Sequence, residues 1–245
     1  MRLQRALTAS VLFVAVLWWI RLIESIGGWN FNVLGVEPHV PFGLIGVVAA
    51  PLLHASWGHL LANTGPVLIL GTALLYGYPR ASRIAVPVIW LGSGLGVWFT
   101  GPLAFHLGAS GLVMGFIVFL IVAGILRRDR TSAAITCAVA FLYGTALVAI
   151  VPQGNVHISY VTHAWGAAMG LLCALTLFRL DPVPPRKRYS WELEKDDQDD
   201  PVIGDLWRYP PQAPTALRPR PPTPRYRKPP GPSVEGRFDK PPRLH

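Results

Sequence analysis

Six long apolar runs, separated by short polar segments, fill the chain up to about residue 180. Each run holds roughly 17–22 residues, enough for an α-helix to cross about 30 Å of hydrocarbon. The runs cover approximately residues 7–24, 58–77, 83–99, 108–126, 132–151 and 159–178. This pattern predicts an all-α fold with six transmembrane helices.

The connection between the first two runs, residues 27–57, is long and rich in Trp, Phe, Leu and Val. A segment of that length and apolarity does not fit a simple exposed loop, so we expect it to lie in the outer membrane interface. The first run follows Arg2 and Arg5, as the core of a signal peptide would. No small-residue cleavage site ends it and five more runs follow, so we expect a retained first helix.

The composition changes sharply after Leu180. Residues 181–245 carry most of the chain's 24 prolines, an acidic run over 192–200 and then basic, proline-rich stretches. Such a segment cannot bury a hydrophobic core, which predicts disorder. The chain therefore divides into a membrane domain, residues 1–180, and a disordered tail, residues 181–245, which is a candidate for binding a cytoplasmic partner.

Basic residues flank the runs on alternate connections only. The connections 27–57, 100–109 and 152–158 hold no Lys or Arg, whereas the other two connections and both ends do. Because Lys- and Arg-rich connections stay in the cytoplasm, we expect both termini there. The net charge of +9 then reflects orientation and contact with anionic lipid, and we expect no nucleic-acid partner. With 51% hydrophobic and 14% charged residues, and Arg preferred over Lys, the chain fits a bacterial plasma membrane.

Four polar side chains interrupt the runs at similar depth. His59 and Asn63 lie in the second run, Ser110 starts the fourth, and His163 lies about one turn into the sixth. At 1.5 Å per residue they lie roughly 3–9 Å below the outer surface, on three helices of one direction. Because polar side chains are costly in hydrocarbon, each is a functional candidate.

The chemistry of these four side chains suggests nucleophilic catalysis. A serine hydroxyl becomes an effective nucleophile when a neighbouring base takes its proton, and neutral histidine is the usual base near neutral pH. Ser110 and His163 supply this pair, and Gly-x-x-x-Gly faces beside them would let their helices approach closely. His59, Asn63 and the backbone N–H at the start of the fourth helix are candidate donors to an oxyanion. His54 is expected to brace this site from the adjoining connection.

Three sequence motifs that contain these residues resemble those of the rhomboid family. The string HASWGHLLANTG, beginning at His54, resembles the family's HxxxxHxxxN motif. GASG at residues 108–111 resembles its GxSG motif, and HAWGAAMG at residues 163–170 resembles its HxxGxxxG motif. The resemblance covers about residues 7–180 and implies a six-helix rhomboid core.

The same resemblance implies an activity. It is that of an intramembrane serine protease in which Ser110 and His163 form a dyad without a third acid, and His59 and Asn63 stabilise the oxyanion. The implied substrates are single-span membrane proteins, cut near the outer leaflet of the bilayer. Many relatives carry a tyrosine four residues after the serine. This chain has Met114 there, and we expect its thioether to support the His163 ring.

The same residues also fit other interpretations. A GxSG element in a membrane helix is often a packing notch, and His54, His59 and His163 are also the residue type that binds metals in transporters. An inactive relative that binds membrane clients is a further alternative. We nevertheless expect no metal and no cofactor.

The remaining Cys and His residues carry no expected chemistry. Cys137 and Cys173 fall inside apolar runs and are predicted to be small buried hydrophobes. His106 and His157 lie in outer connections, where we expect them to be solvated.

Overall fold

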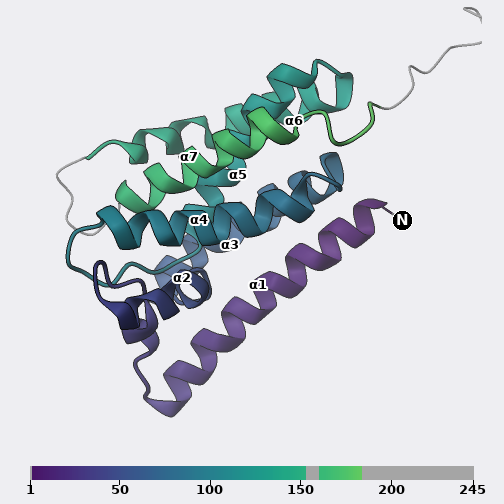
Figure 1. The fold of residues 1–245 in the computed structure, drawn as a ribbon. Helices are drawn as coiled ribbons and strands as arrows, with labels where there is room; N and C mark the ends of the chain where they lie inside the picture. The colour runs from purple at the N-terminus through teal and green to yellow at the C-terminus, as the bar shows by residue number, and fades with distance from the viewer. Residues whose placement is uncertain (1, 153–159, 184–245) are drawn as a thin grey trace, which may run out of the picture. The chain divides into compact units, whose positions relative to one another are not determined.

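The computed structural model describes residues 2–152 and 160–183, and all regular elements in these two ranges are helices (Figure 1). Six of these helices are long and apolar enough to cross a membrane, which confirms the predicted fold class. They are α1 (Arg2–Gly27), α3 (Trp57–Gly77), α4 (Ser82–Thr100), α5 (Ser110–Arg127), α6 (Arg130–Tyr143) with its continuation η4 (Gly144–Ile150), and α7 (Tyr160–Leu177).

The fifth span departs from the expected continuous α-helix. Tyr143, with φ −128° and ψ 1°, leaves the α-helical region, and the chain continues from Gly144 as the 3₁₀-helix η4. A 3₁₀ segment rises about 2.0 Å per residue instead of 1.5 Å, so it covers a given depth with fewer residues. The fifth span is therefore long enough to cross the membrane, but it changes from an α-helix to a 3₁₀-helix near its end.

The connection between α1 and α3 folds into four short helices. These are η1 (Phe31–Leu34), η2 (Pro41–Leu44), α2 (Ile45–Ala49) and η3 (Ala50–Leu52). The connection is tied to the end of α1 by Glu24, whose carboxylate accepts a hydrogen bond from Phe31 N and pairs with Arg21. Phe42, Ile45 and Val48 are exposed, as an interfacial segment requires.

Helix α5 forms the centre of the membrane domain. Eleven of its 18 residues are buried, and it contacts α7, α6, α3 and α4. Helix α1 packs mainly along α3 at one edge of the bundle, and α6 lies beside α5 at another. Of the 14 residues of α6 only Ser132 and Val139 are buried.

Helices α5 and α7 approach each other through the predicted glycine faces. A Cβ added to Gly166 would lie 2.1 Å from Gly111 O, and one added to Gly170 would lie 2.2 Å from Gly115 O. Real Cβ atoms do not approach that closely, so only glycine permits this backbone contact. The expected close packing of the two helices is confirmed.

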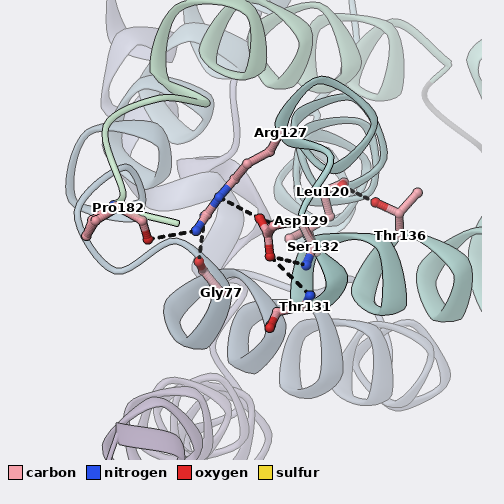
Figure 2. A network of polar contacts seen from close by, with 8 residues as sticks. All are labelled: Gly77, Leu120, Arg127, Asp129, Thr131, Ser132, Thr136 and Pro182. Atoms are coloured by element: carbon pink, nitrogen blue, oxygen red, sulfur yellow. Dashed lines mark hydrogen bonds and ion pairs between the residues drawn. The ribbon is translucent and has the colours of Figure 1, made fainter. Parts of the chain in front are cut away.

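A polar network joins the helix ends at the side of the bundle opposite the α4–α5 connection (Figure 2). The guanidinium of Arg127 donates to Gly77 O and Pro182 O and pairs with Asp129. Asp129 in turn caps α6 by accepting from the backbone N–H of Ser132. Burial alone would raise the pKa of the Asp129 carboxyl, but hydrogen bonds from Ser132 and the charge of Arg127 hold it below its usual value.

Asp181 joins the last described residues to the helix bundle. Its carboxylate is buried and accepts from Arg80 N at 2.8 Å and Ala81 N at 3.0 Å, in the turn before α4. Together with the Pro182 carbonyl, this contact extends the folded region two residues beyond the expected boundary at 180. The rest of the predicted tail, residues 184–245, and His157 lie outside the described residues, so the disorder expected for the tail stays a prediction.

Candidate active site

Ser110 is the first residue of α5, and a tight turn leads the chain to it. Gly108 has φ +109°, a conformation that residues with a Cβ rarely adopt, and Ala109 precedes the helix without a side-chain cap. The first N–H groups of a helix have no partner within the helix, and they carry the positive end of its dipole. The half-buried Ser110 hydroxyl therefore lies beside several backbone donors.

The loop before Ser110 is hydrogen-bonded to the outer connection at three successive points. His106 exchanges two backbone hydrogen bonds with Val36, at 2.8 and 2.9 Å. Gly108 N donates to Ala50 O at 2.8 Å, and Ala109 N approaches His54 Nε2 at 3.5 Å. The connection that follows α1 thus holds the turn before Ser110 in place at the start of α5.

The expectation that His106 is solvated is wrong. Its side chain is 6% exposed, and its Nε2 lies 3.0 Å from Pro102 O within the same loop. The bridge between His106 and Val36 draws the residue inward. A loop position in the sequence gave no sign of this pairing, because the partner segment lies about seventy residues earlier in the chain.

His54 and His59 pack edge to face, with ring centroids 5.1 Å apart. Burial, and next the neighbouring charge of His59, lower the pKa of His54 from 6.5 to about 4. His54 is therefore neutral near pH 7, which lets its Nε2 accept from Ala109 N. The expected bracing role of His54 stays a prediction.

The His59 ring lies against the turn that precedes Ser110. A Cβ added to Gly108 would lie 2.7 Å from His59 Nε2, so the ring occupies the space that a side chain at 108 would need. One turn further along α3, Asn63 is 5% exposed and donates from Nδ2 to His59 O at 3.0 Å. That bond uses one of the two amide hydrogens of Asn63 and leaves the other available.

His163 lies in the first turn of α7 and contacts the end of η4. Its Nδ1 lies 3.1 Å from Ala149 O. A carbonyl oxygen only accepts hydrogen bonds, so Nδ1 carries the proton, and in the neutral ring Nε2 is left as an acceptor.

The α5–α7 contact brings the neighbourhoods of Ser110 and His163 together. A Cβ on Gly111 would lie 2.9 Å from Thr162 Cγ2, so the residues adjacent to Ser110 and His163 touch. Within the described residues, the Ser110 hydroxyl makes no hydrogen bond to His163. Bonds between catalytic groups are often long before substrate binds and shorten in the reacting complex.

Two further features adjoin this site. Met114, one turn after Ser110, is 3% exposed, so it faces the interior and not lipid. A cavity of about 20 Å³ lies behind the Ser110 turn, lined in part by Gly108, Gly111 and Thr162. A volume of that size holds about one water molecule.

The described residues contain no cluster of three His, Cys, Asp or Glu side chains arranged to hold a metal ion. Both cysteines are free thiols, and Cys173 is buried as expected. The expectation that Cys137 is buried is wrong, because it lies on an exposed face of α6 at the edge of the bundle.

Comparison with known sequences finds similarity over most of this region. The sequence model of the Rhomboid domain matches residues 41–180, a range that includes all three motifs. The uncharacterized proteins Rv1337 of Mycobacterium tuberculosis and Mb1372 of Mycobacterium bovis are each 37% identical over 180 residues, covering 69% of this chain and 74% of theirs. The uncharacterized protein ML1171 of Mycobacterium leprae is 34% identical over 176 residues, covering 67% of this chain and 68% of its own.

Proposed function

Because this chain belongs to the rhomboid family of intramembrane serine proteases, we propose that it cleaves transmembrane segments of other membrane proteins with Ser110 as nucleophile and His163 as general base. The observation that carries this proposal is the hydrogen bond of His163 Nδ1 to Ala149 O, which leaves Nε2 as the basic nitrogen on the helix packed against α5. A neutral imidazole with a free Nε2 is the form that accepts a serine proton.

The proposed reaction runs in two halves. Ser110 Oγ attacks the scissile carbonyl while His163 Nε2 takes the hydroxyl proton, and the imidazolium then passes that proton to the leaving amine. A water molecule next attacks the acyl-enzyme ester, again giving a proton to His163, which returns it to Ser110 as the ester breaks. No carboxylate is needed for either proton transfer.

The oxyanion of each tetrahedral intermediate needs preorganised donors. The proposed donors are the N-terminal N–H groups of α5, the His59 ring and the free amide hydrogen of Asn63. Support comes from His59, whose ring packs on Gly108, and from Asn63, which is fixed to the same helix face. Both side chains come from α3, so the site draws on three helices.

The proposed setting is a bacterial plasma membrane. The protein is a multi-pass membrane protein, and its relatives are mycobacterial. The charge pattern of the connections supports a topology with both termini in the cytoplasm. In that topology the Ser110 turn faces the outer leaflet, where single-span substrates would be cut.

Cleavage of a model single-span substrate in proteoliposomes tests this function. Ser110→Ala and His163→Ala should each abolish turnover, whereas Ser10→Ala, a matched change at a buried serine of α1, should leave it intact. A parent protein that binds but never cuts a panel of substrates would favour the inactive-relative alternative. Turnover by Ser110→Ala would exclude Ser110 as the nucleophile.

A further inference from the structure

The hydrogen-bond partner of His163 lies on the least buried of the six membrane spans that the structure describes. Ala149 belongs to η4, which has no buried residue, and η4 extends α6, which has two. By contrast, His163 belongs to α7, whose glycine face packs closely against α5. The hydrogen bond between Nδ1 and the Ala149 carbonyl therefore joins a fixed helix to a loosely held one.

This carbonyl occupies the place that an acid holds in a three-residue serine protease site. In such sites the acid accepts from histidine Nδ1–H and so holds the ring in the tautomer that leaves Nε2 basic. Among the described residues no carboxylate interacts with the His163 ring, and the acceptor at Nδ1 is Ala149 O. A carbonyl can fix the tautomer and the ring orientation in the same way, without adding a negative charge.

We propose that the Ala149 carbonyl is a positioning group for the His163 base, and that the placement of residues 144–150 thereby sets how much of the enzyme is competent. The inference rests on the proposed function of His163. At 3.1 Å the bond lies toward the long end of the normal range, and a displacement of about 1 Å would break it. With the bond broken, the ring is free to rotate or to carry its proton on Nε2, where it can no longer accept from Ser110.

The physical consequence is that catalysis depends on where residues 144–150 lie. Any displacement of α6 and η4 also moves the acceptor of His163. The base is then correctly oriented only when residues 144–150 have returned to the position seen here. Helices with few buried side chains move at small energetic cost, so α6 and η4 can shift and thereby change the orientation of His163.

Replacing the peptide bond between Ala149 and Ile150 by an ester tests the carbonyl directly. The α-hydroxy analogue of isoleucine, incorporated at position 150 of the full chain, makes the Ala149 carbonyl a weaker acceptor and changes no side chain. The matched control is the α-hydroxy analogue of valine at position 151, which removes the 3.1 Å bond from Val151 N to Val148 O in the same segment. It leaves the Ala149 carbonyl an amide.

We expect the ester at 150 to lower kcat and the rate of fluorophosphonate labelling by about three- to tenfold with KM unchanged, since one hydrogen bond is weakened. The control ester should stay within about twofold of the parent. Equal rates for the two esters would overturn the inference. If Ser110→Ala still cleaves substrate, the proposed function itself fails, so the two failures are distinguishable.

The tautomer gives a readout that does not depend on turnover. In the protein with ¹⁵N-labelled histidine, the His163 signals, assigned by their loss in His163→Gln, should show a protonated Nδ1 and an unprotonated Nε2. The ester at 150 should shift this population and the control should not. A predominant Nε2–H form in the parent would overturn the inference even if the ester variants fail to fold.

Discussion

The imidazole of His59 lies directly against the backbone of Gly108, two residues before Ser110. A Cβ at position 108 would come within 2.6 Å of His59 Cε1 and 2.7 Å of Nε2. His54 also packs against this ring, edge to face, which limits where the ring can move. The His59 ring, a candidate oxyanion donor, therefore packs directly on the turn that precedes Ser110, the candidate nucleophile.

The Gly108→Ala variant should lose nearly all activity. The new methyl group would displace the His59 ring, and φ +109° would be strained by about 1–3 kcal/mol for any residue with a Cβ. We expect the melting temperature to fall and turnover to drop by about 10²-fold, the typical effect of losing one oxyanion donor. Turnover and thermal unfolding in detergent measure both effects.

Gly65→Ala is the matched control for that variant. Gly65 lies within α3, and no atom lies within 4 Å of a Cβ placed there. Alanine in a helix interior is favoured over glycine by up to about 1 kcal/mol, but the following Pro66 disfavours a helical residue with a Cβ before it. We therefore expect the activity of the parent and a melting temperature close to that of the parent. If Gly108→Ala matches Gly65→Ala in both measurements, the tight contact with His59 has no functional role.

Asn63 offers a separate test of the oxyanion donors. Asn63→Asp keeps the shape of the side chain but removes both amide hydrogens, so we expect kcat to fall by about 10²–10³-fold with a smaller change in KM. Asn63→Gln retains the amide at a different reach and should recover part of the rate. Unchanged turnover of Asn63→Asp over several substrates would assign Asn63 to packing and to its bond with His59 O.

Much of this architecture follows from local sequence patterns. The lengths of the apolar runs predict the six spans because a helix has one fixed rise per residue, and Gly166 and Gly170 predict the close α5–α7 contact because small residues alone permit it. His59 and Asn63 are predicted on one face because they are four residues apart.

The contacts that shape the site in detail are non-local, and the sequence did not reveal them. The bridge between His106 and Val36 joins two loops, and the bond between His163 and Ala149 joins the ends of two spans. No periodicity encodes such pairs, since each depends on how whole helices are placed. The contact of Asp181 with Ala81 was missed for the same reason.

The buried His54 should make stability depend on pH. The unfolded chain takes up a proton near pH 6.5, whereas the folded protein holds the pKa of His54 at about 4. Between these values the unfolded state binds more protons, so stability should be fully present above pH 6.5 and fall by roughly 2–3 kcal/mol as the pH drops toward 4.

Thermal unfolding of the parent and of His54→Gln across pH 4–7 measures this contribution. Glutamine does not titrate but keeps an acceptor for Ala109 N, so the variant should lose much of the pH dependence. Identical profiles for the parent and His54→Gln would show that His54 does not stay neutral in the folded protein.

Two truncations test the contacts that Asp181 and Pro182 make with the bundle. A chain that stops after Arg188 keeps the contacts of Asp181 and Pro182, so we expect unchanged activity and melting temperature. A chain that stops after Arg179 loses the carboxylate that accepts from Arg80 N and Ala81 N, and with it about 1–3 kcal/mol. Loss of activity in the longer, folded truncation would instead assign the tail a role in catalysis.

Covalent labelling of Ser110 is the most direct test of the proposed Ser110–His163 dyad. A fluorophosphonate reacts only with a serine whose hydroxyl is activated by a base, so the purified parent protein should carry one adduct, which peptide mass spectrometry places on Ser110. The adduct should be absent in Ser110→Ala and should form far more slowly in His163→Ala. An adduct that persists in Ser110→Ala, or one that forms at the parent rate in His163→Ala, would contradict the Ser110–His163 dyad.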